Sequence, residues 1–213
     1  MTQTAPIPPN SDLGPQILHG VAVAFPSINI DTDAIFPKQF LKTIKRTGLE
    51  DALFADWRLD QAGEPNQSFV LNKPGFTDAK ILIAGDNFGC GSSREHAVWA
   101  LKDFGIKALI STSFGSIFQS NCVKNMIWPL TVSLDDLKVL TDLTHHDQPQ
   151  ALTVNLRKMA IFPGDGTTVR ASVSVDDFRS LLSGLDEIDQ TLLKHKTIDA
   201  FEAEHQRRFP WLT

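Results

Sequence analysis

One run of residues, GDNFGCGSSREHA at positions 85–97, carries the side chains of this chain that are best suited to chemistry. Its three glycines let the backbone approach a bound molecule closely, and residues 92–95, Ser-Ser-Arg-Glu, open a segment whose apolar residues recur at helical spacing. A helix start offers unpaired N–H groups and the positive end of the dipole, and Arg94 adds a fork of donors. The run therefore predicts a site for the carboxylate or phosphate of a small anionic ligand.

A purely structural interpretation of the same run is also open. The glycines would then only make a tight turn, and Ser92 and Glu95 would form a Ser-x-x-Glu capping box at the helix start. Arg94 favours a functional site, because a cation in the first helical turn opposes the dipole and needs an anion beside it. The residues alone leave both interpretations standing.

Spacing excludes several catalytic motifs. A Walker A loop needs Gly-Lys-Ser/Thr where this chain has Ser-Ser-Arg, and a dinucleotide loop needs a third glycine after Gly89 and Gly91. A nucleophile elbow needs a glycine two residues after Ser93. Cys90 remains a candidate nucleophile beside a helix start, although His96 lies too far round the helix to serve it as a base. A cysteine hydrolase is thus one alternative, and a stand-alone anion-binding module is another.

A second polar cluster precedes this run, Asn-Ile-Asp-Thr-Asp at positions 29–33. One interpretation is a turn in which the aspartates bind nearby backbone amides. The other is that Asp33 orients a cation, Arg94 or Arg46, across a cleft. On the residues alone the turn is favoured.

The elements that must position these groups follow an α/β pattern. Residues 81–84 are a short apolar run typical of a buried strand, and the glycine loop and a helix ended by Gly105 come directly after it. A strand over residues 106–110 completes a strand–helix–strand unit, whose connection is expected to be parallel and right-handed. A second such unit follows, with a short helix around residues 114–118 and a strand over residues 128–132.

The flanking segments are predicted from turn signals and local periodicity. They comprise a strand over residues 18–24, an irregular surface loop over 25–48, a helix over 49–57, a strand over 68–71, a β-rich patch over 151–175 packed against the α/β part, a helix around 178–182 and a charged helix over 189–208. Four prolines near the start predict a flexible arm over residues 1–17, ahead of a single domain over residues 18–213.

Composition restricts the classes of partner. The chain has 213 residues, enough for one full hydrophobic core, and 20 basic against 25 acidic residues give a net charge of −5. It has no Lys/Arg block to follow a nucleic-acid backbone, no apolar stretch of the ~20 residues that span a bilayer, and no signal-peptide pattern at its start. We therefore expect neither nucleic acid nor a membrane as a partner. We expect a cytoplasmic location.

The cysteine count bears on metals. The two cysteines, Cys90 and Cys122, fit a reducing compartment. They cannot by themselves complete a four-ligand zinc site or a four-thiolate cluster, so we expect no metal site on this chain alone.

Four runs of residues resemble one known family and stand in the right order: NIDTDAIFPKQFLK, GDNFGCGSSREHAVWAL, SFGSIFQSNCVKN and the closing PWL. They are similar to the small subunits of 3-isopropylmalate dehydratase, in the aconitase superfamily, over nearly the whole chain from residue 18. The resemblance implies a compact swivelling β/β/α domain like the C-terminal domain of aconitase. Such a domain closes over a 4Fe-4S cluster held by a separate large subunit, so the cofactor is expected on the partner and none on this chain.

The resemblance also implies an activity. The enzyme would be a hydro-lyase of leucine biosynthesis, a branched-chain amino-acid pathway, and would act only as a complex with the large subunit, at its simplest a heterodimer. In this reaction 2-isopropylmalate loses water to give 2-isopropylmaleate, which is rehydrated to 3-isopropylmalate. The substrate would be a small dicarboxylate.

The family's site residues can be carried onto matching positions. The resemblance places the proton-abstracting base at Ser92, whose alkoxide needs nearby amides and cations to stabilise it. The matching substrate-binding residues are Ser93, Arg94 and, after a one-residue shift, Arg46. Asp33, with Thr32 beside it, matches a Thr-Asp pair that positions the substrate-binding residues without contacting the substrate. Cys90 and Cys122 match ordinary family positions, which weakens the hydrolase alternative.

The resemblance also assigns substrate specificity to one loop. In this superfamily the loop over residues 36–47 covers the substituent at the reacting carbons, and an isopropyl group needs apolar contacts there. The apolar residues available in it are Phe36, Phe40, Leu41 and Ile44. Because a methylene in a pocket changes discrimination by only ~1–3 kcal/mol, small subunits of citraconate, dimethylmalate or homoaconitate hydratases remain alternatives.

Overall fold

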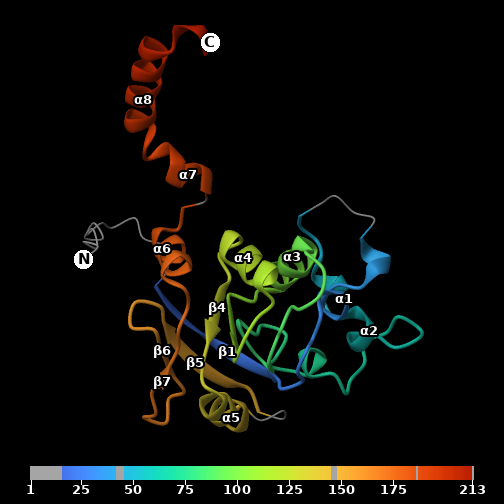
Figure 1. Ribbon diagram of the computed structural model, residues 1–213. Helices are drawn as coiled ribbons and strands as arrows, with labels where there is room; N and C mark the ends of the chain where they lie inside the picture. The colour runs from blue at the N-terminus through green and yellow to red at the C-terminus, as the bar shows by residue number, and fades with distance from the viewer. Residues whose placement is uncertain (1–15, 42–45, 145–147, 186, 213) are drawn as a thin grey trace.

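The computed structural model describes residues 16–41, 46–144, 148–185 and 187–212 (Figure 1). Within them, seven strands form one curled sheet with the order β4-β3-β2-β1-β5-β6-β7. The strands are β1 (Ile17–Phe25), β2 (Ile81–Ala84), β3 (Ala108–Ser111), β4 (Trp128–Thr131), β5 (Gln150–Asn155), β6 (Ala160–Phe162) and β7 (Val169–Arg170).

Two kinds of strand pairing meet at β1. On one side β1 pairs in parallel with β2, and the parallel order continues through β3 to β4. On the other side β1 pairs antiparallel with β5, and β6 and β7 follow. A bridge between Thr131 and Ser172 brings the two far ends of the sheet together. The expected α/β class and its parallel units are confirmed, but the β-rich patch is the antiparallel half of the same sheet and not a separate layer.

Helices form most of the connections. The longer ones are α3 (Glu95–Phe104), α4 (Ser116–Lys124), α5 (Leu134–Leu143), α6 (Val175–Ser183) and α8 (His195–Arg208). The short ones are α1 (Thr32–Ile35), α2 (Ala55–Arg58), α7 (Glu187–Leu192) and the 3-10 helices η1 (Lys38–Phe40), η2 (Glu50–Ala52), η3 (Val70–Asn72) and η4 (Pro210–Leu212). As predicted, α3 is ended by Gly105, which has a left-handed φ of 109°.

The central strands are buried on both faces, which explains their unbroken apolar sequences. Successive side chains of β2 point to opposite faces, so Leu82 joins one core cluster while Ile81 and Ile83 join the other. Helices α3 and α4 cover the Leu82 face, and α5 lies on the opposite side of the sheet (Figure 1). Helices thus cover both faces of the sheet, and an apolar core cluster lies between each face and its helices.

The predicted helix over residues 49–57 is wrong. The segment contains η2 and α2, separated by Phe54 in the left-handed region at φ 50°. Phe54 is completely buried, with its ring centroid 5.2 Å from that of Phe25 and 5.6 Å from that of Trp57. Tertiary burial of this ring therefore overrides the local helical pattern.

Two other local predictions are also corrected. Residues 68–71, expected as a strand, lead into η3, where the Asn72 side chain donates to the Arg58 carbonyl at 2.6 Å. The segment over residues 25–48, expected as an irregular surface loop, contains α1 and η1 and buries Ile35 completely. Its buried part packs into the same core cluster as α3.

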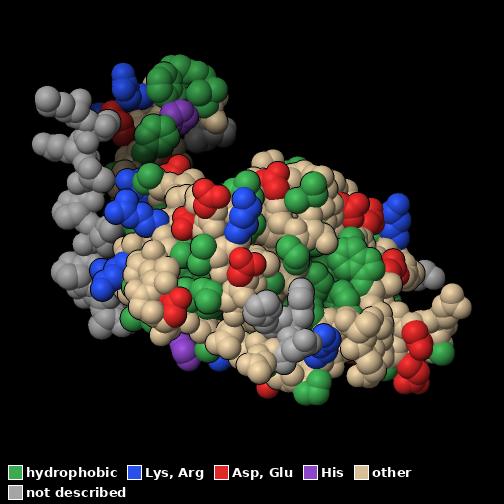
Figure 2. All heavy atoms as spheres, turned by 90° about the horizontal axis from the view of Figure 1, so that it is seen from below, with side chains coloured by type: hydrophobic (Ala, Val, Ile, Leu, Met, Phe, Trp, Pro, Cys, Tyr) green, Lys and Arg blue, Asp and Glu red, His purple; other side chains and the backbone are tan. Residues whose placement is uncertain are grey.

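The predictions for the two ends of the chain have different outcomes. The expected arm falls largely on residues 1–15, which lie outside the described residues, and β1 already begins at Ile17. At the other end, the single charged helix expected over residues 189–208 is instead α7 and α8, which project from the domain (Figure 1). Apolar side chains are exposed on this projection (Figure 2), among them Leu193, Phe201 and Trp211. Among the described helices, none is long and apolar enough to cross a membrane.

Candidate active site

The first three of the four quoted runs lie in or begin in loops that meet at one edge of the sheet. They follow Phe25 at the end of β1, Ala84 at the end of β2 and Ser111 at the end of β3. Because these strands are parallel neighbours, their carboxyl ends lie together. This is the edge at which open α/β sheets bind their ligands.

The glycine loop after β2 is hydrogen-bonded on both sides. On the β1 side, Gly89 N–H donates to the Ile30 carbonyl at 2.7 Å. On the β3 side, Gly115 N–H donates to the Phe88 carbonyl at 2.9 Å. The loop thus continues the sheet beyond β2, and its position relative to the other two motifs is fixed by backbone bonds.

The glycines of this loop are required by packing within the chain. Gly89 has a φ of 73°, and a Cβ there would lie 2.2 Å from the ring of Phe118 on α4. At Gly85 a Cβ would lie 2.3 Å from the Ser27 carbonyl oxygen. At Gly85 and Gly89 the close approach is therefore to neighbouring segments of the same domain, whereas a Cβ at Gly91 would lie 3.5 Å from the nearest atom, Asp31 Cβ, which is an ordinary contact.

Gly89→Ala is expected to destabilise the domain by about 3 kcal/mol or more, because the left-handed backbone and the overlap with Phe118 add. Gly164→Ala is the matched control, since Gly164 has a φ of 97° but a Cβ added there would meet nothing within 4 Å. The control should lose only about 1 kcal/mol. Denaturant unfolding of both variants measures the difference, and equal losses would show that the overlap is relieved at no cost.

Hydroxyl groups from the loop after β3 hold the start of the glycine loop. The carboxylate of Asp86 accepts hydrogen bonds from Ser113 Oγ at 2.6 Å and from Thr112 Oγ1 at 2.7 Å. These bonds, the one from Ser113 first, lower the pKa of Asp86 below its ordinary value. The sequence does not reveal this role, because Thr112 lies outside the quoted runs and nothing in the run that begins at Ser113 links it to Asp86.

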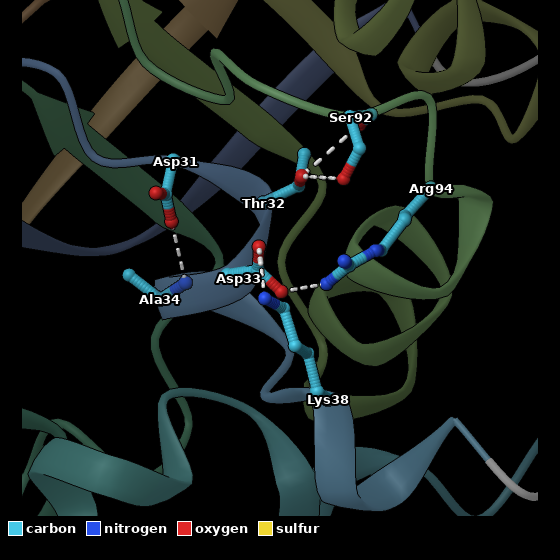
Figure 3. A network of polar contacts seen from close by, with 7 residues as sticks. All are labelled: Asp31, Thr32, Asp33, Ala34, Lys38, Ser92 and Arg94. Atoms are coloured by element: carbon cyan, nitrogen blue, oxygen red, sulfur yellow. Dashed lines mark hydrogen bonds and ion pairs between the residues drawn. The ribbon is translucent and has the colours of Figure 1, made fainter.

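Ser92 lies at the exposed tip of the glycine loop, facing the 29–33 segment (Figure 3). The Thr32 hydroxyl donates to the Ser92 carbonyl at 3.0 Å, and its Oγ1 lies 3.3 Å from Ser92 Oγ. Thr32 is only 1% exposed, so α1 holds its hydroxyl in place. Thr32 therefore positions Ser92, while Ser92 itself stays open to solvent.

Arg94 forms an ion pair with Asp33, between Nη1 and Oδ1 (Figure 3). The other carboxylate oxygen of Asp33 lies 3.9 Å from Lys38 Nζ, a residue that the sequence did not single out. Asp31 instead caps α1 by accepting from Ala34 N–H at 2.7 Å. Both interpretations of the 29–33 segment thus apply, to different aspartates: one makes a turn and the other orients a cation.

The predicted capping box is wrong. Helix α3 begins at Glu95 with Arg94 as its N-cap residue, and the Arg94 side chain makes no capping hydrogen bond. The Ser92 carbonyl accepts both the Thr32 hydroxyl and the Arg94 N–H, the latter at 2.8 Å, which draws the serine toward the 29–33 segment. The side chain at the N-cap position therefore does not compete with an anion for the amides at the start of α3.

An open cavity of about 560 Å³ adjoins the Arg94 side chain. It is lined by residues from the loop after α1 and from α3 and α4, which are Leu41, Ser93, Arg94, Glu95, His96, Trp99, Ile117, Asn121 and Lys124. The guanidinium carbon of Arg46 lies 5.1 Å from the ring centroid of Trp99. Two of the three predicted substrate-binding residues thus line the cavity, and the third lies beside one of its wall residues.

Of the four residues expected to contact the substrate's alkyl group, Phe40 is half-buried, packs against the core cluster and is not among the residues that line the cavity. Leu41 lines the cavity. Phe36 is completely buried in the core, where its ring packs against His96 and Phe40, so the expectation that it faces the substrate is wrong. Ile44 lies outside the described residues. Trp99 and Ile117, which the sequence did not indicate, supply further apolar wall.

Cys90 has no activated thiol. Burial, and next the negative charge of Asp31, raise the pKa of Cys90 above its ordinary value. Burial raises the pKa of Cys122 still further. A reactive cysteine needs the opposite shift, so the cysteine hydrolase alternative loses its support.

Cys90→Ala should keep turnover by the assembled enzyme within about twofold, because the thiol is neutral near pH 7 and no step depends on it. Steady-state rates before and after alkylation of the wild-type complex give a parallel check. Loss of turnover in both experiments would restore the cysteine hydrolase.

The described residues do not fit an iron–sulfur cluster. Cys122 is buried in α4 within the hydrophobic core, away from the loop that carries Cys90. In the described ranges, no three His, Cys, Asp or Glu side chains form a group that could hold a metal ion. The two cysteines of the chain are also too few for a four-thiolate cluster.

Comparison with known proteins gives the family. Residues 16–135 match the family model described as the aconitase C-terminal domain, and residues 187–213 match the C-terminal domain of the 3-isopropylmalate dehydratase small subunit. The 3-isopropylmalate dehydratase small subunits of Brucella canis and Rhizobium etli are 53% and 52% identical to the chain, over 91% of its length and 96% of theirs. A crystal structure of 3-isopropylmalate dehydratase from Methanocaldococcus jannaschii aligns with a TM-score of 0.63 and 29% identity, covering 87% of this chain and 99% of that one.

The curled mixed sheet and the serine–arginine loop at its carboxyl edge are therefore those of an aconitase-type swivel domain. Within that class, the match over nine-tenths of the chain is to one kind of protein. The chain belongs to the family of 3-isopropylmalate dehydratase small subunits.

Proposed function

We propose that this chain forms, with a large subunit, a hydro-lyase that interconverts 2-isopropylmalate and 3-isopropylmalate through 2-isopropylmaleate in leucine biosynthesis. The observation that carries the proposal is the Ser92–Thr32 contact beside the Arg94–Asp33 ion pair, at the start of an uncapped helix. Family membership supports the reaction class and the need for a large subunit.

Ser92 is the proposed base. Its Oγ takes the proton from the methylene carbon of 2-isopropylmalate as water leaves, and returns a proton to the neighbouring carbon when water adds in the other sense. An alkoxide at Ser92 would be stabilised by the uncapped amides of α3 and by the Arg94 charge. Thr32 Oγ1 lies 3.3 Å from Ser92 Oγ, so its single proton, which is donated to the Ser92 carbonyl in the resting structure, can turn toward this anion.

Ser93 and Arg94 are the proposed ligands of one substrate carboxylate, because both line the cavity next to Ser92. Arg94 uses Nη1 for Asp33, which leaves its other N–H donors for a second anion. Arg46, held over Trp99, is the proposed ligand of the other carboxylate. Asp33 and Thr32 position these groups and do not touch the substrate.

The partner supplies the remaining chemistry in this proposal. A 4Fe-4S cluster on the large subunit would act as a Lewis acid on the departing hydroxyl group. At its simplest the complex is a heterodimer, and a cytoplasmic location agrees with the free thiols of both cysteines.

A substrate comparison tests the proposal. The chain is co-expressed with its large subunit, purified without oxygen, and assayed with 2-isopropylmalate, citraconate, dimethylmalate and homoaconitate. We expect kcat/KM for 2-isopropylmalate to exceed the others by about tenfold or more, since Leu41, Trp99 and Ile117 offer an apolar wall. Preference for another diacid would reassign the substrate, and absence of turnover with all four would reject the function.

A stand-alone anion-binding module remains the second candidate. It predicts tight binding of malate-like diacids by the isolated chain in calorimetry. The remaining N–H donors of Arg94 and the cavity beside it favour this candidate too, so the calorimetry result separates it from the enzyme.

A further inference from the structure

The anion-binding arginine of this site is already paired with an acid. Arg94 and Asp33 form an ion pair in which the Arg94 side chain is 19% exposed and the Asp33 side chain 38% exposed. Such a pair is close to electrically neutral. A neutral pair attracts a dicarboxylate only weakly. Arg94 alone therefore explains how a substrate carboxylate would be oriented, but not how the negatively charged substrate would be attracted to the site.

Lys38 changes this balance. Its Nζ lies 3.9 Å from Asp33 Oδ2, on the opposite carboxylate oxygen from the one that Arg94 binds (Figure 3). With Lys38 included, two cations share one carboxylate and the cluster carries one net positive charge. On the rest of the cavity wall, the charge of Glu95 offsets that of Lys124.

The fold places Lys38 at this point. Asp33 lies in α1, and Pro37, with a φ of −62°, turns the chain into η1, whose first residue is Lys38. The Lys38 side chain is 73% exposed, so this contact contributes little to the stability of the domain. Its effect is therefore electrostatic: it acts on the charge that Asp33 presents to Arg94.

We propose that Lys38 is a positioning residue of the substrate site, which holds the second oxygen of Asp33 and thereby leaves Arg94 with positive charge available to a substrate carboxylate. The inference rests on the proposed function, because it assigns Arg94 a dicarboxylate ligand. It adds a residue that acts through Asp33 and does not itself contact the substrate.

The test compares Lys38→Met, Lys38→Arg and Lys107→Met in the assembled enzyme with 2-isopropylmalate. For Lys38→Met we expect KM to rise about two- to fivefold with kcat nearly unchanged, since one unit charge near the site is lost while the reacting groups are kept. The rise should shrink as ionic strength increases, because salt screens exposed charges. Lys38→Arg should restore KM, and Lys107→Met, an exposed lysine just before the amino end of β3, should leave it unchanged.

The outcomes separate this inference from the proposed function. If the wild-type complex turns over 2-isopropylmalate but Lys38→Met keeps the wild-type KM, Lys38 has no part in binding and the inference fails alone. If Lys38→Met instead prevents assembly with the large subunit, or if its KM does not depend on salt, the residue is an interface or structural lysine and the inference also fails. If the wild-type complex shows no turnover, the proposed function fails first.

Discussion

Ser92→Ala is expected to lower kcat of the assembled enzyme by about 10³-fold, within the range for loss of a general base, while KM changes little. The variant should fold and assemble normally, because Thr32 donates to the Ser92 backbone carbonyl and this bond survives the loss of the hydroxyl. The measurement is steady-state turnover of 2-isopropylmalate together with unfolding of the isolated chain.

Ser116→Ala is the matched control for this loss. Ser116 is an exposed serine at the first position of α4, the neighbouring helix, and its removal should leave turnover unchanged. Near-normal activity of Ser92→Ala would remove Ser92 from the role of base. Equal losses in both variants would point to a general effect of the region on assembly.

Arg94→Lys has the second largest expected effect, a fall in kcat/KM of about 10²-fold. A lysine keeps the charge and can still pair with Asp33, but it lacks the planar fork that binds two carboxylates at once. Because Asp33 keeps a partner, the unfolding free energy should change by less than about 1 kcal/mol.

The control for this substitution is Arg179→Lys on α6, where the arginine makes an exposed ion pair with Asp176 at 3.6 Å. It should change neither kcat/KM nor stability measurably. If Arg94→Lys retained full activity, Arg94 would serve only as a charge. If it unfolded the chain, the arginine would be structural.

Part of the parallel half of the fold could be predicted because short apolar runs and a helix-ending glycine mark its central elements. Residues 81–84 and Gly105 are examples, and both predictions are confirmed. Helix α5 is not among the predicted elements, although the sequence carries a signal for it. Ser133 accepts from Asp136 N–H at its start, and Leu137 and Leu140 lie on its buried face.

Other elements could not be predicted locally because distant residues decide them. Phe54 leaves the helical region to bury its ring against Phe25, which belongs to β1. Ser92 does not cap α3 because Thr32, sixty residues earlier in the chain, bonds to it. Local patterns describe neither contact, since both depend on which loops meet at the sheet edge.

The candidate site shows the same division. Ser92, Ser93 and Arg94 were predicted from one motif, and the structure gathers them with Thr32 and Asp33 at one edge of the sheet (Figure 3). Lys38, which shares Asp33 with Arg94, lies within one of the quoted runs, as do Trp99 and Ile117 of the apolar wall, but no residue pattern assigns them a role in the site. They could be recognised only once the cavity and the ion pairs were placed in space.

The central claim is that this chain supplies one half of an active site. The most direct test is an anaerobic titration in which a fixed amount of cluster-loaded large subunit receives increasing amounts of this chain, while turnover of 2-isopropylmalate is followed. We predict no turnover by either subunit alone and a rate that rises to saturation with this chain. For Ser92→Ala we predict the same saturation of binding, with a rate lower by about 10³-fold. Turnover of 2-isopropylmalate by either isolated subunit would contradict the claim.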